Sequence, residues 1–312
     1  MIWAKQLIEE NYALERVIGC GRSGIVATAR HARLGLRVAL KFLRPDKPRT
    51  PEVVKRFVRE GQISARIQNA HVTRVLDIGR LPGGEPFIVM EHLEGCDLAA
   101  LLDARGPLAS ADAASYIRQA CFGLASTHAS GIIHRDLKPA NLFLTLAPNG
   151  APLVKLLDFG SAEQRGGEQE PTPEPLDLGS APIVAPEQLK AGRRADSRTD
   201  IWALGATLFT LLSGRAPFER SYASETYLAI LSGRVPDLTA LRPDIERPLA
   251  ALVERCLAAD PSQRFGSAAE LGSALLPFTK LSGPASARRA PRAPSRDSPN
   301  KSASAPCESA AL

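Results

Sequence analysis

The feature that most constrains the fold is the segment IIHRDLKPANLFL at residues 132–144. Five residues with charged, imidazole or amide side chains stand within eight positions, and hydrophobic residues flank them on both sides: His134, Arg135, Asp136, Lys138 and Asn141. Burying such groups costs free energy unless they are hydrogen-bonded or paired. A fold that contains this segment must therefore bury the flanks and supply partners or ligands to the polar loop.

Length and composition fit a globular body followed by a separate tail. The chain has 312 residues, 44% of them hydrophobic, which suits one large domain or two lobes. Of the formal net charge of +6, residues 280–312 contribute +4. Their Ser, Ala, Pro and Arg cannot bury enough surface to fold. We expect a disordered basic tail at 279–312, for which a regulatory protein is a better partner than nucleic acid.

Cysteine usage and hydropathy indicate the compartment. The five cysteines stand far apart with no C-x-x-C pair, so the sequence carries no zinc or redox signature, and reduced thiols fit a cytosolic protein. The N-terminal residues include acidic side chains and lack the long apolar core of a secretory signal. The longest apolar stretch, at 201–214, is too short to span a bilayer. We therefore expect a cytoplasmic protein without a membrane span.

Strand-like segments dominate residues 12–93, and helical segments dominate the remainder. One helix interrupts the strands, with Thr50 as its expected cap and Pro51 as its first residue. The later part contains a long amphipathic helix at 110–131 and an apolar helix that we expect to be central. The pattern predicts an α+β protein with a small strand-rich lobe, a larger helical lobe and a ligand in the cleft between them.

Two motifs in the strand-rich part are suited to phosphate. Gly19, Gly21 and Gly24 form G-x-G-x-x-G, in which glycines let backbone amides approach a phosphate. A dinucleotide-binding fold would continue into a helix, whereas strand-like residues follow here; an ordinary tight turn is the other alternative. Lys41 lies in VALKFL, a strand otherwise built for burial, so a phosphate and a carboxylate such as Glu60 would compensate its charge. The alternative is a lysine that extends to solvent.

The polar loop and a later acidic motif together fit phosphoryl transfer. Asp136 can accept a proton from an incoming hydroxyl. Asn141 and, in LLDFGSA, Asp158 offer hard oxygen ligands for magnesium. Lys138 adds a positive charge that can steady the transferred group. Phosphoryl transfer needs little covalent chemistry from the protein, only a metal ion and an aligned hydroxyl.

Five motifs follow one another along the chain: G-x-G-x-x-G-x-V, V-A-L-K, H-R-D-L-K-P-A-N, D-F-G and A-P-E. In this order the chain resembles the eukaryotic-type serine/threonine protein kinases common in bacteria, over about residues 11–278. The resemblance implies the bilobal protein-kinase fold, with an N-lobe at 1–93, a C-lobe at 94–278 and the tail at 279–312. It also implies ATP and Mg²⁺, with Mn²⁺ as the alternative ion, and protein substrates with Ser or Thr acceptors.

The resemblance further implies a role for each matching position. The positions at the nucleotide would be Gly19, Gly21, Gly24, Val26, Ala39, Lys41, Glu60, Glu91, Leu93 and Phe143. The catalytic base and its neighbouring lysine would be Asp136 and Lys138, and the metal ligands Asn141 and Asp158. Four further positions would be structural. His134 would support the catalytic loop, Asp200 would anchor it from beneath, and Glu187 would form a buried ion pair with Arg264.

The segment between the D-F-G and A-P-E motifs departs from the family pattern. Arg135 precedes the expected base, where a phosphate on this segment can pair with it and order the loop. Thr172 is the best acceptor, and a plain turn residue is the alternative. An acidic side chain can also pair with Arg135 without phosphorylation, the candidates being Glu163, Glu168, Glu170 and Glu174. Ser180 keeps a hydroxyl near A-P-E, but the tyrosine usual there is missing, so the family's substrate preference does not carry over.

Three functions are open on the sequence. The complete set of Lys41, Glu60, Asp136, Asn141 and Asp158 favours a signalling kinase that transfers the γ-phosphate of ATP to Ser or Thr and autophosphorylates, in trans within a kinase dimer. The altered segment before A-P-E keeps a pseudokinase scaffold as the second function. A small-molecule kinase of the antibiotic-phosphotransferase type is the third, although such enzymes usually lack the A-P-E region. Because of its lysine, the motif H-R-D-L-K-P-A-N resembles that of the serine/threonine kinases rather than that of the tyrosine kinases.

Overall fold

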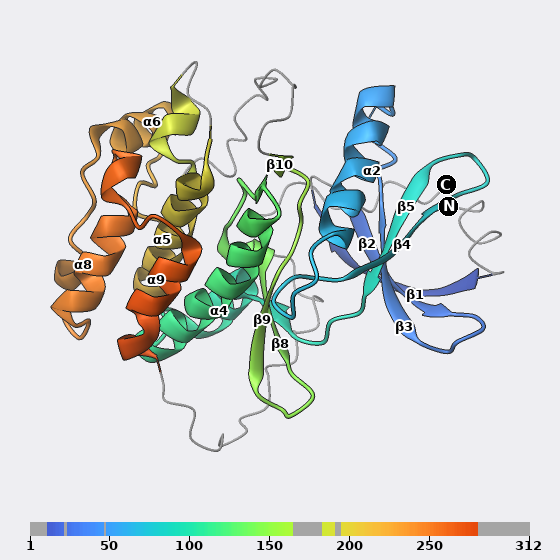
Figure 1. Cartoon of the computed structure of the whole chain (residues 1–312), viewed down its shortest axis with the longest axis horizontal. Coiled ribbons are helices and arrows are strands. Elements are labelled where there is room, and N and C mark those ends of the chain that lie inside the picture. The colour runs from blue at the N-terminus through green and yellow to red at the C-terminus, as the bar shows by residue number, and fades with distance from the viewer. Residues whose placement is uncertain (1–10, 22–23, 47, 165–182, 191–194, 280–312) are drawn as a thin grey trace. The chain divides into compact units, whose positions relative to one another are not determined.

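The computed structural model describes residues 11–21, 24–46, 48–164, 183–190 and 195–279, which fall into two compact units. The first unit contains the described residues up to 66 together with 73–94, and the second contains 67–72 and the described residues from 95 onward. Figure 1 traces the elements of both along the chain. Over these ranges, no helix is both long enough and apolar enough to cross a membrane.

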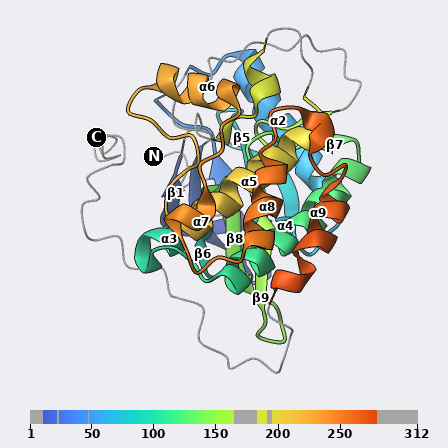
Figure 2. The ribbon, with the colours of Figure 1, turned by 90° about the vertical axis from the view of Figure 1, so that its left-hand side faces the viewer.

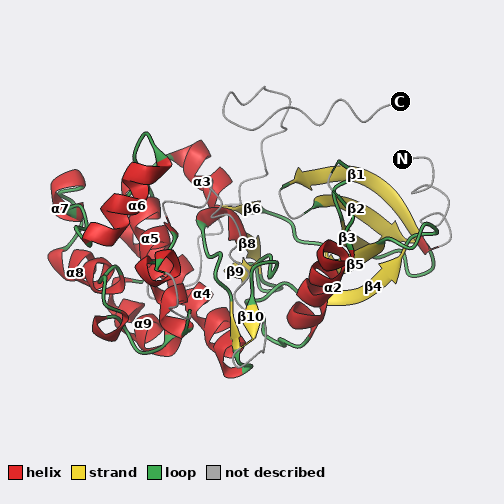
Figure 3. Ribbon diagram, turned by 90° about the horizontal axis from the view of Figure 1, so that it is seen from above, coloured by secondary structure: helices red, strands yellow, loops and turns green. Residues whose placement is uncertain are grey.

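The described part of the first unit contains a five-stranded sheet and a helix packed on it. The strands pair antiparallel in the order β1-β2-β3-β5-β4. Their bounds are β1 (Tyr12–Cys20), β2 (Ile25–His31), β3 (Arg37–Phe42), β4 (Val75–Arg80) and β5 (Pro86–Glu91). The helix α2 (Pro51–Ala65) packs against β4 and β5, as Figure 3 shows. The strand-rich character expected for this part of the chain is confirmed.

The predicted start of α2 is present. The Thr50 hydroxyl accepts a hydrogen bond from the N–H of Val53 at 3.4 Å, and Pro51 is the first helical residue. Inside the helix, Gly61 lies where a Cβ atom would stand 2.9 Å from Cδ1 of Ile78. Because α2 approaches the sheet this closely, a larger residue at position 61 would have to displace the side chains of Ile78 and Ile88.

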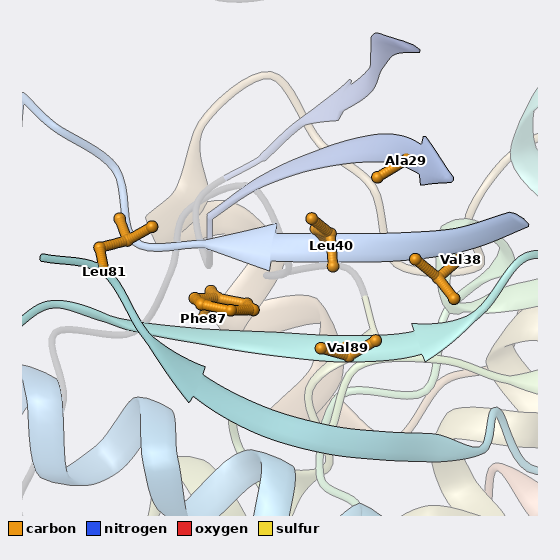
Figure 4. Close-up of a cluster of buried hydrophobic side chains, with 6 residues drawn as sticks. All are labelled: Ala29, Val38, Leu40, Leu81, Phe87 and Val89. Carbon is orange, nitrogen blue, oxygen red and sulfur yellow. The ribbon is translucent and has the colours of Figure 1, made fainter. Parts of the chain in front are cut away.

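The register of the sheet separates a core face from the face that carries Lys41. Side chains alternate along a strand, so residues two apart share a face. Figure 4 shows the core cluster, which consists of Ala29, Val38, Leu40, Leu81, Phe87 and Val89. Val26 pairs with Lys41 across β2 and β3, and Ala39 stands two residues before Lys41. Val26, Ala39 and Lys41 therefore share the face opposite Val38 and Leu40.

The second unit is mainly helical, as expected. Its helices are α3 (Leu98–Arg105), α4 (Ser110–Ala129), α5 (Ser197–Ser213), α6 (Ala223–Ser232), α7 (Leu238–Leu241), α8 (Arg247–Cys256) and α9 (Ala268–Leu275). Figure 2 looks onto these helices. The apolar helix α5 packs against α4, α8 and α9, and its Trp202 and Phe209 are completely buried. The expectation that α5 is central is confirmed for this unit.

Short strands also occur in the second unit, where the sequence indicated mostly helix. They form one sheet in the order β6-β8-β9 and a second that pairs β10 with β7. Their bounds are β6 (Cys96–Asp97), β7 (Ile132–Ile133), β8 (Leu142–Leu146), β9 (Pro152–Leu156) and β10 (Glu163–Gln164). Runs this short show too little periodicity to distinguish a strand from a buried helical turn. These strands matter because β7 and β8 bracket the polar loop.

Residues 67–72 belong to the second unit, although they lie inside the segment expected to form the N-lobe. The side-chain amide of Asn69 donates to the hydroxyl of Ser126 on α4 at 2.6 Å. The carbonyl of His71 accepts from the N–H of Leu156 at 2.8 Å, and its ring Nδ1 lies 2.9 Å from the carbonyl of Val154. Sequence position alone did not indicate these partners, which are more than fifty residues away.

Candidate active site

The glycine motif lies at the turn between β1 and β2. The N–H of Gly21 donates to the carbonyl of Gly24 at 2.9 Å, and residues 22–23 between them lie outside the described part. At Gly24, where φ is +156°, a Cβ atom would stand 2.3 Å from the carbonyl oxygen of Phe42. At Gly21 no atom of the described residues lies within 4 Å of such an atom. The fold therefore requires glycine at position 24, whereas the space at Gly21 is open to an approaching group.

This difference gives a prediction with a matched pair of variants. Gly24→Ala should lower the free energy of unfolding by about 1–3 kcal/mol, because its methyl group overlaps the backbone of β3. Gly21→Ala should leave stability within about 0.5 kcal/mol and weaken ATP binding by about tenfold, because its methyl group would occupy the open space that an approaching phosphate would use. Thermal unfolding and ATP titration of both variants measure the two effects. Equal melting temperatures would contradict this assignment.

Lys41 and Glu60 form a buried ion pair within the first unit. Lys41 of β3 is 5% exposed and Glu60 of α2 is 8% exposed, and Nζ of the lysine contacts Oε1 of the glutamate. A buried ammonium is costly without such a partner. The lysine therefore does not extend to solvent, and α2 fixes its position on the sheet.

The remaining positions expected at the nucleotide are divided between the units. Glu91 ends β5, and its N–H donates to the carbonyl of Arg74 at 3.0 Å while its Oε1 accepts from the N–H of Arg74 at 2.8 Å. Leu93 follows in the loop after β5 and is half-buried. Phe143, also half-buried, belongs to the second unit and lies on β8.

The polar loop of the second unit surrounds the carboxylate of Asp136 with donors. Nζ of Lys138 lies 3.0 Å and 2.9 Å from its two oxygens. The side-chain amide of Asn141 donates to Oδ2 of Asp136 at 3.0 Å and to the backbone carbonyl of Asp136 at 2.7 Å. Asn141 ends the short 3₁₀ turn Pro139–Asn141, which brings it back over the aspartate. The carboxylate is thus held in place and partly neutralised by side chains two and five positions away.

Asp200, at the start of α5, ties down the backbone of this loop. It is completely buried, and its Oδ1 accepts from the N–H of Arg135 at 2.8 Å while its Oδ2 accepts from the N–H of His134 at 2.9 Å. Arg135 has a φ of +67°, a conformation that non-glycine residues adopt only where surrounding contacts hold it. The same Oδ2 lies 2.7 Å from Nε2 of His128. The sequence pattern did not reveal His128, whose only signal was its place in the last turn of a helix.

His134 and Asp158 join the loop to the D-F-G motif. His134 is completely buried, its Nε2 lies 3.0 Å from the carbonyl of Leu157, and its ring lies against that of Phe159 at 4.8 Å between centroids. Asp158 has a φ of +58°, and its Oδ1 accepts from the N–H of Gly160 at 3.0 Å. The histidine therefore supports the segment from which Asp158 projects.

The oxygen donors in the loop and the D-F-G motif fit a divalent ion of the magnesium type. The amide nitrogen of Asn141 is engaged with Asp136, so its Oδ1 is the atom suited to coordination, and Asp158 supplies a carboxylate. In the described ranges, no group of three or more His, Cys, Asp or Glu side chains could hold a metal ion. Mg²⁺ commonly takes few protein ligands and completes its shell with water and phosphate oxygens, so this sparse set fits.

Glu187 and Arg264 form the second buried ion pair. The side chain of Arg264 is fully buried, and its guanidinium donates to both carboxylate oxygens of Glu187 at 2.8 Å. The hydroxyl of Thr199 donates a third hydrogen bond to this carboxylate at 2.9 Å. Burial acts to raise the pKa of Glu187, but the hydrogen bonds and charge of Arg264 outweigh it and hold that pKa below its ordinary value. The carboxylate is therefore charged at neutral pH and depends on Arg264.

Comparison with known proteins assigns this arrangement to a family. Residues 12–274 match the protein kinase domain family. The chain belongs to the protein kinases. The kinase domain thus accounts for nearly all of the described residues, and the family implies the use of ATP and a divalent metal ion.

Several relatives of this kinase domain come from bacteria. Serine/threonine-protein kinase Pkn1 of Myxococcus xanthus is 34% identical over 265 residues, which span 85% of this chain and 38% of that protein. Serine/threonine-protein kinase PknB of Mycobacterium tuberculosis is 34% identical over 274 residues, which span 86% and 43%. The crystal structure of the PknI kinase domain from Mycobacterium tuberculosis aligns with a TM-score of 0.66 at 30% identity, covering 86% of this chain and 96% of that one. The chain therefore spans about two fifths of the length of these curated relatives.

Of the regulatory positions expected from the sequence, Arg135 lies within the described residues. Nη1 of Arg135 lies 2.6 Å from Oε2 of Glu163. Glu163 is one of the four glutamates that the sequence offered as partners, and it lies within the described residues. Thr172, Ser180 and the other three glutamates lie outside the described residues, as does the tail from residue 280 onward.

Proposed function

We propose that this kinase domain transfers the γ-phosphate of ATP to serine and threonine hydroxyls of proteins, its own chain included, in signal transduction. The observation that carries the proposal is the Asp136 carboxylate, held by Lys138 and by the amide of Asn141. A substrate hydroxyl needs an acceptor for its proton that is fixed in place, and a carboxylate positioned by two donors meets that need.

Four side chains of the second unit each have a task in this reaction. Asp136 orients the hydroxyl and accepts its proton. Lys138, within hydrogen-bond distance of that carboxylate, offsets negative charge on the transferred phosphoryl group. Oδ1 of Asn141 and the carboxylate of Asp158 would hold the divalent ion, Mg²⁺ by preference and Mn²⁺ as the alternative. The ion, when bound, neutralises phosphate charge.

The first unit supplies the groups proposed to bind the nucleotide. Lys41, positioned by Glu60, would contact the α- and β-phosphates, and the glycine loop would cover them. Because the N–H of Glu91 already donates to Arg74, a contact from Glu91 to the adenine would come from its carbonyl oxygen. The proposed nucleotide-binding set is Gly19, Gly21, Gly24, Val26, Ala39, Lys41, Glu60, Glu91, Leu93 and, from the second unit, Phe143.

Two observations support serine and threonine as acceptors. Lys138 follows Asp136 in the pattern D-L-K-P-A-N, which is typical of the serine/threonine branch. The relatives named above are serine/threonine-protein kinases. The altered residues before A-P-E mean that the sequence around the acceptor is not carried over from those relatives.

The experiment that tests the function uses purified chain, labelled ATP and two acceptors, a generic protein and an aminoglycoside. We expect label on serine and threonine of the protein and of the chain itself, and loss of transfer when EDTA removes the divalent ion. ATP binding without any transfer would identify a pseudokinase. Label on the aminoglycoside alone would identify a small-molecule kinase, and label on tyrosine would contradict the acceptor assignment.

Regulation and partners belong to the same proposal. Thr172 is the proposed site of a regulatory phosphate that would pair with Arg135, and Ser180 a hydroxyl directed to the catalytic loop. Autophosphorylation in trans would take place in a kinase dimer, and the basic tail would bind a regulatory protein. The contact between Arg135 and Glu163 bears directly on whether the phosphate on Thr172 is required.

A further inference from the structure

The charge of Arg135, next to the catalytic base, is matched by a carboxylate of the same chain. Nη1 of Arg135 lies 2.6 Å from Oε2 of Glu163, and the two side chains are 32% and 35% exposed. Glu163 is the fifth residue after Asp158, close behind the D-F-G motif. A phosphate arriving on the segment that follows would therefore find this arginine already paired.

Backbone pairing places Glu163 at this position. Strand β10 runs antiparallel to β7, with Glu163 opposite Ile133 and Gln164 opposite Ile132. Both isoleucines are buried, at 4% and 3% exposure, so β7 is anchored in the core. Glu163 thus lies opposite Ile133, which stands two residues before Arg135 in the sequence. The pairing uses backbone groups and needs no phosphate.

Arg135 is consequently held at two points. Its N–H donates to Asp200 at 2.8 Å, and its guanidinium contacts Glu163. Between these points its backbone has the unusual φ of +67°. Asp136 is the next residue, so the direction in which its carboxylate projects depends on this conformation. Loss of either attachment gives the backbone freedom to leave the positive-φ region.

We propose that Glu163 is a positioning residue for phosphoryl transfer: its carboxylate takes the place of a phosphorylated residue, and the catalytic loop of this kinase domain is held in its working arrangement without phosphorylation of Thr172. The inference rests on the proposed function of Asp136. It specifies that the regulatory phosphate proposed for Thr172 is not required for phosphoryl transfer.

The primary test is kinetic and uses the full chain freed of phosphate by a phosphatase, with mass spectrometry to verify its removal. Glu163→Gln should lower kcat roughly fivefold, the effect of about 1 kcal/mol for a partly exposed ion pair, with the KM for ATP unchanged. The matched control is the triple variant Glu168→Gln, Glu170→Gln and Glu174→Gln, which removes three charges of the same kind from the neighbouring segment. The control and Thr172→Ala should both retain wild-type kcat.

A double-mutant cycle tests that Glu163 acts through Arg135. Arg135→Gln should lower kcat as Glu163→Gln does, and the double variant should be no worse than the poorer single variant. Glu163→Asp should retain more activity than Glu163→Gln because it keeps the charge. Full activity of Glu163→Gln would overturn the proposal. So would a dephosphorylated wild type that is inactive and recovers when Thr172 is phosphorylated.

A second readout separates this inference from the proposed function. The amides of His134 and Arg135 donate to Asp200, so their hydrogen exchange reports the order of the loop without any catalysis. Exchange in the peptide that covers 132–138 should be severalfold faster in Glu163→Gln than in wild type, while the triple control matches wild type. If wild type transfers no phosphate but its exchange is still slower than that of Glu163→Gln, the proposed function is contradicted and the positioning role is not. Equal exchange in both would overturn the positioning role.

Discussion

Asp136→Asn is expected to abolish phosphoryl transfer while leaving the fold and ATP binding in place. The carboxylate accepts hydrogen bonds from Lys138 at both oxygens and from Asn141 at one. An amide of the same shape presents a single acceptor oxygen and cannot take up the proton of a substrate hydroxyl. Loss of a general base costs about 10²–10⁴-fold in rate. We expect kcat to fall within that range, with the affinity for ATP changed little.

The measurement compares three purified proteins by steady-state kinetics, ATP titration and thermal unfolding. Asp103→Asn is the matched control, because Asp103 lies exposed on α3, and it should behave as wild type. A melting temperature of Asp136→Asn near that of wild type shows that the loss is chemical. If Asp136→Asn keeps kcat within tenfold of wild type, Asp136 is not the base.

Arg264→Met is expected to produce the largest loss of stability among single substitutions at the site. Arg264 donates to both oxygens of Glu187 and to the carbonyls of Ala258 and Arg198. Glu187 is ionised at neutral pH while Arg264 holds its pKa below the ordinary value, and removing Arg264 would leave this buried carboxylate with the Thr199 hydroxyl but without a cation. Breaking a buried pair from one side costs about 3–5 kcal/mol.

Thermal unfolding measures this effect, for which we expect a fall of roughly 6–20 °C in melting temperature, at about 2–4 °C for each kcal/mol. The matched control is Arg255→Met, since Arg255 pairs with Glu270 at 2.9 Å while both side chains are nearly half exposed, and such pairs contribute at most about 1 kcal/mol. The double variant Glu187→Met with Arg264→Met should recover part of the loss because it removes both charges. Equal melting temperatures for Arg264→Met and Arg255→Met would refute this account.

Local signals in the sequence were sufficient for much of the fold. The cap at Thr50 with Pro51 behind it, the buried helix α5 and the strand-rich first part all depend on residues near one another in the chain, and each is present. The strands β8 and β9 escaped prediction because five-residue runs are ambiguous on their own. Residues 67–72 belong to the second unit because Asn69 and His71 form hydrogen bonds with Ser126 and Leu156, which are distant in the sequence.

The sequence by itself determined the family and the residues available for chemistry, because the kinase motifs are short, local and ordered along the chain. Only the tertiary structure decided how these residues are held. It placed Glu163, one of four candidate glutamates, in contact with Arg135, since β10 pairs with β7, and it brought His128 to the aspartate that anchors the loop. His128 and Asp200 are 72 positions apart, and Arg135 and Glu163 are 28 apart. Contacts over such separations depend on how the elements pack, which no local pattern encodes.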